Sequence, residues 1–498
     1  MASLRSFENA VKWSYAANWG ERGFSALFTV FLAGILGPRD FGTAAIALIY
    51  IGFLQMFLDQ GFLAALIQRK NLAPEHLDAV FWMNQAFSVF LVVLSLLFAG
   101  WWAARNHTPE LAKIISVLSL CIPIEGLASV QGALLKREMD FKSLSIRSNI
   151  SVLVGGVVGL GMALAGFRVW ALVGQQITRD VTALVLLWNL SSWRPRLEFS
   201  WTPLRSLMSF SVSNFVAQLA LFVESQASSI LLGLFFGPIA VGLYRVADRV
   251  TNSIMSIAGS SIQAVSLPEF ARLQDKPEEL RRSVLSCIRL SSIVTLPGLT
   301  GLAVVSGPLM ATLGTKWVPA TGLLKILSVL GMFFIFDFFT GPLLQARSMT
   351  HQLAILVWTR VCAGTAILVI AGLMVRNGSV NSQIVGIGLA RLVTVAFLIT
   401  PACLYIMKRL CRISLRDFRV AIAPSVIASA SIVASLMLFH ASGWLVNAKP
   451  IILLIAEVAV GGVVGLAVLL WLEIQLRRLA VEMFQRSVRT QATFKAPI

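Results

Sequence analysis

Fourteen apolar runs constrain the fold of this chain most strongly, because each is about as long as a bilayer's hydrocarbon core is thick. A helix of about 20 apolar residues crosses that core with all its backbone polar groups paired internally. The predicted spans, each placed to within a few residues, are 13–36, 42–62, 79–104, 111–135, 149–166, 169–190, 206–236, 239–266, 284–313, 320–345, 352–375, 380–405, 418–440 and 450–475. We therefore expect an all-α integral membrane protein with no soluble domain.

Composition agrees with this interpretation. The 498 residues are 57% hydrophobic and 13% charged, and their mean hydropathy is +0.81, which leaves too little polar surface for a soluble globule. The five cysteines show no CxxC spacing, and none of the four histidines has another at i+4. The sequence also has no phosphate-binding loop of the form GxxxxGK[ST]. We expect no metal site, no cofactor and no ATP-driven step within this chain.

The net charge of +18 is mainly a signal of topology rather than of nucleic-acid binding. Of the 41 Lys and Arg residues, 26 lie at the chain ends and in the even-numbered loops, whereas 7 lie in the opposite loops. Basic residues concentrate on the cytoplasmic side of membrane proteins, so both termini are predicted to be cytoplasmic. Specific binding of anionic lipid headgroups is an alternative role for some of these loops.

An internal repeat relates the two halves of the chain. At an offset of 200 residues, Leu32, Gly37, Pro38 and Gly42 align with Leu232, Gly237, Pro238 and Gly242. At an offset of 212, Gly166, Val173, Gly174, Arg179, Val181 and Thr182 align with Gly378, Val385, Gly386, Arg391, Val393 and Thr394. Two parallel six-helix bundles are typical of transporters whose halves rock about a central site. The predicted regions are an N-lobe (1–190), a cytoplasmic linker (191–205), a C-lobe (206–410), two trailing spans (411–475) and a basic cytoplasmic tail (476–498).

Sixteen charged residues remain inside the predicted spans. They are Arg22, Arg179, Arg245, Arg249, Arg289, Lys325, Arg360 and Arg391, with Glu21, Asp59, Glu125, Asp180, Glu224, Asp248, Asp337 and Glu457. Each costs about 2.5–3.5 kcal/mol at the centre of a lipid-facing helix. Most must therefore face a polar interior, form ion pairs or extend to the membrane surface.

The candidate binding residues come from this set. Arg245, Asp248 and Arg249 have i, i+3, i+4 spacing and share one helix face. They form either an internal ion pair that packs the bundle or, with Arg22, a cationic face that attracts an anionic substrate. Arg179-Asp180 and Arg391 occupy matching places in the repeat and are predicted to be structural. Glu224 and Asp337 are the candidate carriers of a coupling proton.

Four stretches together resemble a known family. They are Leu36-Gly37-Pro38-x-x-Phe41-Gly42, Asp59-Gln-Gly61-Phe62-x-x-Ala65-Leu66-Ile67-Gln68-Arg69, Val80-Phe81-Trp82-x-Asn84 and Gly242-x-Tyr244-x-x-Ala247-x-Arg249. In order and spacing they are similar to the polysaccharide-transporter branch of the multidrug/oligosaccharidyl-lipid/polysaccharide (MOP) exporter superfamily, which includes the MATE transporters, and especially to its Wzx-type flippases. The likeness extends from the N-terminus to about residue 410.

The resemblance implies a fold and a function. Two six-helix lobes would surround a central cavity lined by the first, second, seventh and eighth spans, with two trailing helices. The protein would turn an undecaprenyl-pyrophosphate-linked oligosaccharide from the cytoplasmic to the periplasmic leaflet of a bacterial inner membrane, for exopolysaccharide or lipopolysaccharide (O-antigen) biosynthesis. Coupling to a proton or sodium ion, and cooperation with a polymerase and export proteins, are also implied. The cavity role falls on Arg22, Asp59, Glu224, Arg245, Asp248 and Arg249, of which Asp59 and Arg249 lie in the matching stretches.

Two other functions compete with this interpretation. A membrane polymerase or lipid-dependent glycosyltransferase of the same pathway usually carries its chemistry on a long outer loop, and no predicted outer loop here exceeds about a dozen residues. Its acidic residues would also be paired, whereas Asp40 and Glu110 stand alone. A MATE-type drug exporter would share the fold, but basic residues in the core favour an anionic, lipid-linked substrate. The sequence leaves the sugar, the coupling ion and the oligomeric state open.

Overall fold

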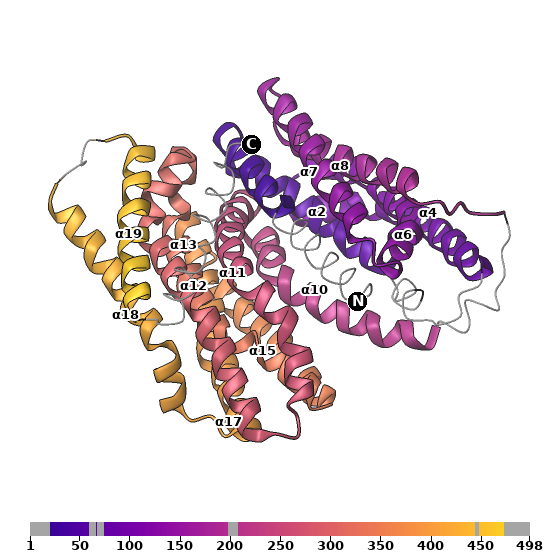
Figure 1. Cartoon of the computed structure of the whole chain (residues 1–498). Helices are drawn as coiled ribbons and strands as arrows, with labels where there is room; N and C mark the ends of the chain where they lie inside the picture. The colour runs from indigo at the N-terminus through magenta and orange to yellow at the C-terminus, as the bar shows by residue number, and fades with distance from the viewer. Residues whose placement is uncertain (1–19, 59–65, 67–73, 198–207, 444–447, 473–498) are drawn as a thin grey trace, which may run out of the picture. The chain divides into compact units, whose positions relative to one another are not determined.

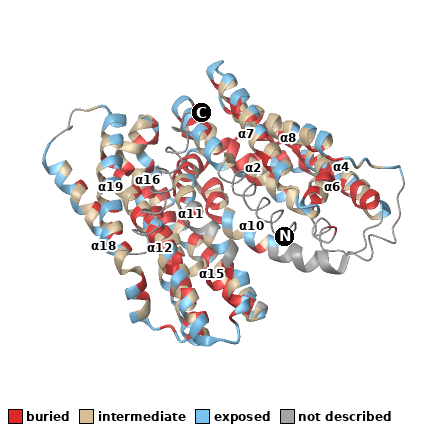
Figure 2. Ribbon diagram, in the orientation of Figure 1, coloured by how far each residue is buried: buried red, intermediate tan, exposed pale blue. Residues whose placement is uncertain are grey.

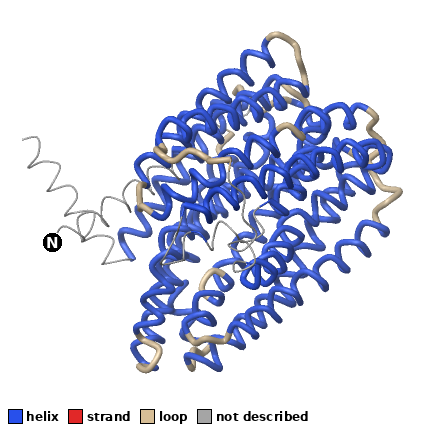
Figure 3. Tube along the Cα trace, turned by 90° about the vertical axis from the view of Figure 1, so that its right-hand side faces the viewer, coloured by secondary structure: helices blue, strands red, loops and turns tan. Residues whose placement is uncertain are grey.

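Helices make up almost all of the chain that this computed structural model describes, which is residues 20–58, 66, 74–197, 208–443 and 448–472. Figure 3 shows these helices joined by short loops, with no strand among the described residues. Each predicted span consists mostly of helical residues where it is described. The predicted all-α class is therefore confirmed.

The helices follow one another closely along the chain (Figure 1). Residues 20–35 are helical. The remaining elements are α2 (Pro38–Leu58), α4 (Pro74–Arg105), α5 (Glu110–Leu118), α6 (Cys121–Arg137), α7 (Phe141–Leu164), α8 (Val169–Leu190), α10 (Met208–Phe236), α11 (Pro238–Arg272), α12 (Pro277–Thr312), η1 (Thr315–Ala320), α13 (Thr321–Asp337), α14 (Thr340–Ala346), α15 (Thr350–Met374), α16 (Val380–Val393), η2 (Thr394–Ile399), α17 (Thr400–Cys411), α18 (Leu415–Ala441) and α19 (Pro450–Leu472).

Eleven helical segments of the described chain are long and apolar enough to cross a membrane. They establish a multi-pass membrane protein. Three of the fourteen predicted spans are not among the eleven: the helical residues 20–35, α8 and α11. These helices contain seven of the sixteen charged residues named above, including Glu21, Arg179 and Asp248. The number fourteen stays a prediction.

Two compact units divide the chain. One unit comprises residues 1–246 and 357–387, and the other comprises residues 247–356 and 388–498. The boundaries fall within α11, α15 and α16. The predicted lobes, 1–190 and 206–410, stay a prediction.

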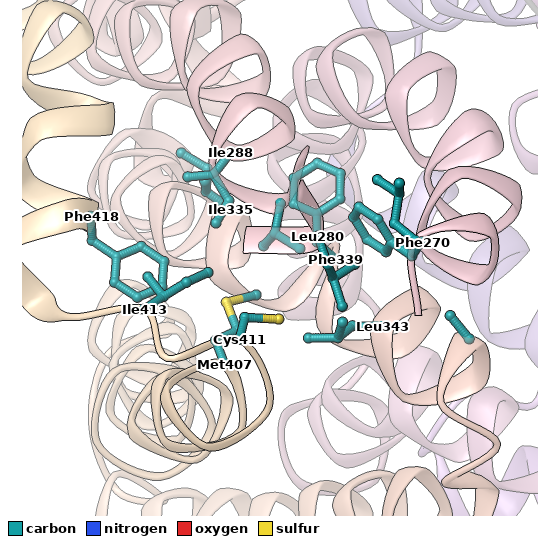
Figure 4. Close-up of a cluster of buried hydrophobic side chains, with 13 residues drawn as sticks. Phe270, Leu280, Ile288, Ile335, Phe339, Leu343, Met407, Cys411, Ile413 and Phe418 are labelled. Atoms are coloured by element: carbon teal, nitrogen blue, oxygen red, sulfur yellow. The ribbon is translucent and has the colours of Figure 1, made fainter. Parts of the chain in front are cut away.

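Aromatic and aliphatic side chains form the core of the second unit (Figure 4). Leu280, Val284 and Ile288 are four residues apart on α12, so they lie on one face of that helix. This face packs with Phe339, which precedes α14, and with Phe418 on α18. All five side chains are almost fully buried. Helices distant in sequence are therefore held together by one apolar core.

The first unit has an aromatic cluster that fixes the segment after α8. Phe81 on α4 packs edge-on against Trp82 and Trp193. Trp82 Nε1 donates to the carbonyl of Arg196 at 2.6 Å, and Arg196 N donates to Asp78 Oδ1 at 2.9 Å. The beginning of the predicted linker is therefore hydrogen-bonded to the start of α4.

Apolar side chains cover much of the exposed surface of the trailing helices. Figure 2 shows exposed and intermediate residues over most of α18 and α19. Met437, Leu438, Val463, Leu466 and Trp471 are among the exposed large apolar residues. So much exposed apolar surface fits contact with lipid rather than with water.

The repeated Gly-Pro motifs contact each other directly in the first unit. A Cβ atom on Gly42 would overlap the carbonyl of Pro238, and one on Gly242 would overlap the carbonyl of Pro38. The same positions would lie 2.9 Å and 3.0 Å from the backbone nitrogens of Gly242 and Gly42. The N-terminal turns of α2 and α11 are therefore in backbone contact, as small residues permit in membrane helices. Each motif meets its own counterpart in the repeat.

A capping box begins α18 and connects it to α12. Ser414 Oγ accepts from Asp417 N at 3.3 Å, and Asp417 Oδ2 accepts from Ser414 N at 2.8 Å. Arg281 Nη2 on α12 lies 3.0 Å from the same carboxylate oxygen. The cap therefore fixes where the first trailing helix starts and holds it beside the second unit's core.

We expect Ser414→Ala to lower the free energy of unfolding by about 1 kcal/mol, because the first turn of α18 loses its N-cap acceptor. The measurement is thermal unfolding of the purified protein in detergent. Ser431→Ala, at an exposed position within α18, is the control and should leave the midpoint nearly unchanged. Equal midpoints for the two variants would contradict this role of the cap.

Candidate transport site

Three ion pairs join charged residues from different membrane helices. Arg179 on α8 lies 2.7 Å from Glu21, and Arg360 on α15 lies 2.8 Å from Glu224 on α10. Arg391 on α16 lies 3.2 Å from Asp248 on α11. The first two pairs lie in the first unit and the third lies in the second unit. Six of the sixteen charges inside the predicted spans are therefore compensated by an oppositely charged partner on another helix, which lowers their cost in lipid.

Glu21 is held by two helices of the first unit. Arg179 Nη2 donates to its Oε1, and Ser148 Oγ on α7 donates to its Oε2. Both carboxylate oxygens thus accept a hydrogen bond. The predicted structural role of Arg179 agrees with this arrangement, although the sequence suggested Asp180 as its neighbour rather than Glu21 as its partner.

Glu224 pairs with Arg360, which the sequence analysis left without a role. The two side chains are only 23% and 14% exposed, so this is the most enclosed of the three pairs. Arg360 is one of the sixteen interior charges, but its distance of 136 residues from Glu224 hides the contact in the sequence. A carboxylate bound in this way is fixed in position by a charge-assisted hydrogen bond.

Asp248 is bound by an arginine on another helix. Its Oδ1 accepts from Arg391 Nη1, and its Oδ2 accepts from Asn252 Nδ2 at 2.9 Å. Arg245, one turn earlier, donates instead to Gln226 Oε1 at 3.2 Å. The face of α11 that carries Arg245 and Asp248 is therefore hydrogen-bonded to two other helices, α16 and α10.

Arg391 lies just before an irregular helical segment. Residues Thr394–Ile399 form the π-helix η2, and α17 follows with Pro401 in its first turn. π-Helical turns widen the backbone locally and occur often at functional sites. The ion pair with Asp248 is thus adjacent to the part of this helix whose backbone departs from α geometry.

The other predicted site residues are distributed as follows. Arg22 and Arg249 are exposed in the structure. Asp337 ends α13, where Cys403 Sγ on α17 lies 3.6 Å from its Oδ1. Asp59 lies outside the described residues. No group of three or more metal-binding side chains occurs in the described ranges.

Equivalent helices of the repeat hold carboxylates in a similar way. At the offset of 212 residues, Arg179 corresponds to Arg391, and each pairs with an acid on another helix. At the same offset Ser148 on α7 corresponds to Arg360 on α15, and these donate to Glu21 and Glu224. The donors are thus equivalent in the repeat, whereas Glu21 and Asp248 lie on spans that are not.

These arginines have the chemistry needed to bind an anion. A guanidinium group can donate two parallel hydrogen bonds to either a carboxylate or a phosphate. An arginine now paired with a carboxylate can therefore exchange that partner for a phosphate without becoming unpaired in the membrane. Such an exchange would couple anion binding to the contacts between helices.

A family described as "Polysaccharide biosynthesis protein" matches residues 31–321 of the chain. Among curated relatives, the succinoglycan biosynthesis transport protein ExoT of Rhizobium meliloti is 28% identical over 64% of this chain and 65% of its own length. The teichuronic acid biosynthesis protein TuaB of Bacillus subtilis is 25% identical over 59% and 62%. The lipopolysaccharide biosynthesis protein WzxC of Escherichia coli is 24% identical over 68% and 70%. The match thus spans a little under two thirds of the first two relatives.

Solved structures match over more of the chain. The lipid II flippase MurJ, in an inward closed conformation, has a TM-score of 0.72 and 13% identity, covering 94% of this chain and 99% of its own. An inward-facing multidrug resistance MATE transporter of the MOP superfamily has a TM-score of 0.58 and 14% identity, covering 80% and 96%. The predicted MATE/MOP-like fold is confirmed by these matches.

Proposed function

Because the chain belongs to the polysaccharide biosynthesis protein family, we propose that it is a flippase for a lipid-linked oligosaccharide. Its substrate is an oligosaccharide repeat unit on undecaprenyl pyrophosphate, which it turns from the cytoplasmic to the periplasmic leaflet of a bacterial inner membrane. The product supplies exopolysaccharide or lipopolysaccharide assembly. Both termini are cytoplasmic, and the protein is a secondary transporter rather than an enzyme.

The observation that supports this proposal most strongly is the extent of the fold match. The lipid II flippase shares its fold with 94% of this chain, including the two trailing helices that a twelve-helix repeat alone would not need. The relatives are named for succinoglycan, teichuronic acid and lipopolysaccharide. Such different polymers suggest that what these proteins recognise in common is the lipid carrier rather than one sugar.

Alternating access accounts for the buried charges. In the inward-open state, the pyrophosphate is attracted by arginines of the cavity wall, and the glycan enters between the lobes. The lipid tail stays in the bilayer. The binding residues are Arg22, Asp59, Glu224, Arg245, Asp248 and Arg249. Glu224 and Asp337 are the candidate sites for a coupling proton or sodium ion, and a polymerase and export proteins of the pathway are the partners.

Binding of the pyrophosphate can shift the protein from the inward-open to the outward-open conformation by exchanging the partners of two ion pairs. Asp248 is now held by Arg391, and Glu224 is held by Arg360. A pyrophosphate that takes over one of these arginines releases its carboxylate, and the released carboxylate favours a different packing of the helices. The energy for this rearrangement comes from substrate binding and ion entry, because the sequence contains no nucleotide-binding loop.

Arg249 is the residue whose replacement tests the site most directly. We expect Arg249→Ala to reduce polymer export about 10-fold to 100-fold, which corresponds to losing one hydrogen bond to a charged group. The measurement is surface polysaccharide in cells whose own copy of the gene is deleted. Arg272→Ala, at the exposed end of the same helix, is the matched control. Full export by Arg249→Ala, at normal membrane levels, would remove Arg249 from the site.

Drug export is a second candidate function, because the MATE transporter shares the fold. An exporter of this kind would protect cells against cationic drugs when it is overproduced. Our proposal expects no protection. Protection that is independent of the polysaccharide genes would favour the drug exporter instead.

A further inference from the structure

Glu457 is the single charged residue of α19, the most apolar of the candidate spans in the described chain. It is the eighth residue of that helix, about 10 Å along its axis from Pro450. Its side chain is 0% exposed. An acid at that depth is expensive in a membrane and is retained only where it has a use. Neither the predicted site nor the proposed binding step uses Glu457.

His440 on α18 is the partner of this carboxylate. Its Nε2 lies 2.8 Å from Glu457 Oε1, and its side chain is 47% exposed. His440 is the second-last residue of α18, and the predicted topology places that end of the helix at the outer surface. The pair therefore connects a fully enclosed acid to an imidazole near the predicted outer surface, whose two ring nitrogens can each carry a proton.

The second oxygen of Glu457 faces an apolar environment. Oε2 is buried and has no hydrogen-bond partner among the described residues. Glu457 lines a cavity of about 470 Å³ between α11, α12, α18 and α19, whose other lining residues are apolar side chains and glycines such as Leu302, Leu436 and Gly461. An apolar lining offers no hydrogen bond to an ionised carboxylate, so burying the charge there costs free energy. A protonated carboxyl group costs less.

Among the described residues, no other titratable group lines this cavity from the helices packed against Glu457. The charged residues of α12 and α18 are confined to their N-terminal ends, at the opposite surface. They are Glu278, Glu279, Arg281, Arg282 and Arg289 on α12, and Arg416, Asp417 and Arg419 on α18. α11 contributes Ile254 to the lining. Lys449, just before α19, is exposed. Among the described residues, His440 is therefore the ion-pair partner of Glu457.

We propose that His440 and Glu457 form a proton-binding site through which the outer proton concentration drives this transporter. The inference rests on the proposed flippase function and adds to it the coupling ion and the place where that ion enters. It differs from the candidate carriers Glu224 and Asp337, because Glu457 lies on a trailing helix outside the repeat.

One proton enters in the proposed step, and only bonds to hydrogen form or break. A proton from the outer side bonds to Nδ1 of His440. The N–H bond at Nε2 then breaks as an O–H bond forms at Glu457 Oε1, which leaves a neutral imidazole and a neutral carboxyl group. The buried negative charge is gone, so the cost of keeping Oε2 against the apolar wall disappears. Packing of α19 against α12 and α18 thereby becomes dependent on the outer pH.

Infrared difference spectroscopy of the full-length protein in lipid tests proton binding without any substrate. The probe is acidification of the buffer, and the signal is the C=O stretch of a protonated carboxyl group. We expect Glu457→Gln to lack one such band that the wild-type protein gains. His440→Gln should shift the pH at which the band forms. His351→Gln, at an exposed position, is the matched control for His440→Gln and should not shift this pH. If the wild-type and Glu457→Gln difference spectra coincide, the inference is wrong.

Flipping in proteoliposomes tests the coupling. An inward proton gradient should speed wild-type flipping of an undecaprenyl-pyrophosphate-linked oligosaccharide about 10-fold, as typical coupling free energies allow. Glu457→Gln should flip at the wild-type rate without a gradient and gain nothing from one. If the gradient speeds flipping by Glu457→Gln as much as flipping by the wild type, the proposed proton site is wrong, but the proposed flippase function is still supported. Absence of wild-type flipping with and without a gradient contradicts the proposed function, whereas the infrared result would still decide whether the pair binds a proton.

Discussion

Gly42→Ala and Gly242→Ala should each destabilise the protein by about 1–3 kcal/mol, the usual cost of forcing extra volume into a packed interface. The added methyl group at either site would overlap a backbone carbonyl, that of Pro238 or of Pro38. A backbone carbonyl at a helix start cannot move aside as a flexible side chain can. The crossing of α2 and α11 must therefore open, and with it the contact between the two copies of the motif.

Glycines in open surroundings serve as controls for these two substitutions. A Cβ atom on Gly34 or Gly100 would meet nothing within 4 Å. Alanine there should stabilise the helix by up to about 1 kcal/mol, because it has the higher helix propensity. Thermal unfolding in detergent measures all four variants. Gly42→Ala and Gly242→Ala with unfolding midpoints as high as the controls would show that the two motifs are not in contact.

Arg360→Ala should cost about 3–5 kcal/mol, because it leaves the carboxylate of Glu224 uncompensated in a nearly closed site. The two side chains are 14% and 23% exposed and their charged atoms are 2.8 Å apart. Glu224→Gln combined with Arg360→Ala should recover most of the loss, since the unpaired charge is then gone. Unfolding midpoints of the single and double variants measure the coupling.

The exchange of charges offers a stricter test of the same pair. Glu224→Arg with Arg360→Glu keeps the two opposite charges in contact and should be more stable than either single reversal. Arg376→Ala, in the exposed loop after α15, is the control for replacing an arginine and should be neutral. Additive effects in the exchange variant would mean that Glu224 and Arg360 do not interact.

The helices were predictable because they depend on local pattern. Apolar runs of about 20 residues locate helices whatever their neighbours are. The repeat placed Arg391 in the same position as Arg179, and each forms an ion pair. The Gly-Pro alignment predicted equivalent turns, but it did not predict that the turns touch, since contact between two helices depends on how the bundle closes.

The ion-pair partners of the charged residues were harder to predict than the positions of these residues in the spans. Arg360 was one of sixteen interior charges, and nothing in the sequence joins it to Glu224. The stripe of Arg245, Asp248 and Arg249 was correctly placed on one helix, but its members turn to partners on other helices or remain exposed. His440 and Glu457 lie only 17 residues apart, on successive predicted spans. A search for acids and histidines close to the same end of neighbouring spans would have found this pair.

Flipping by the purified protein tests the proposed flippase function most directly. Proteoliposomes would contain the full chain and an undecaprenyl-pyrophosphate-linked oligosaccharide labelled on its sugar, and a membrane-impermeant enzyme outside would cleave the exposed sugar. With the wild-type protein, we expect the protected half of the label to become cleavable, and Arg249→Ala to slow this about 10-fold or more. If half of the label stays protected in the presence of correctly folded wild-type protein, with and without a proton gradient, the chain is not a flippase for this class of lipid.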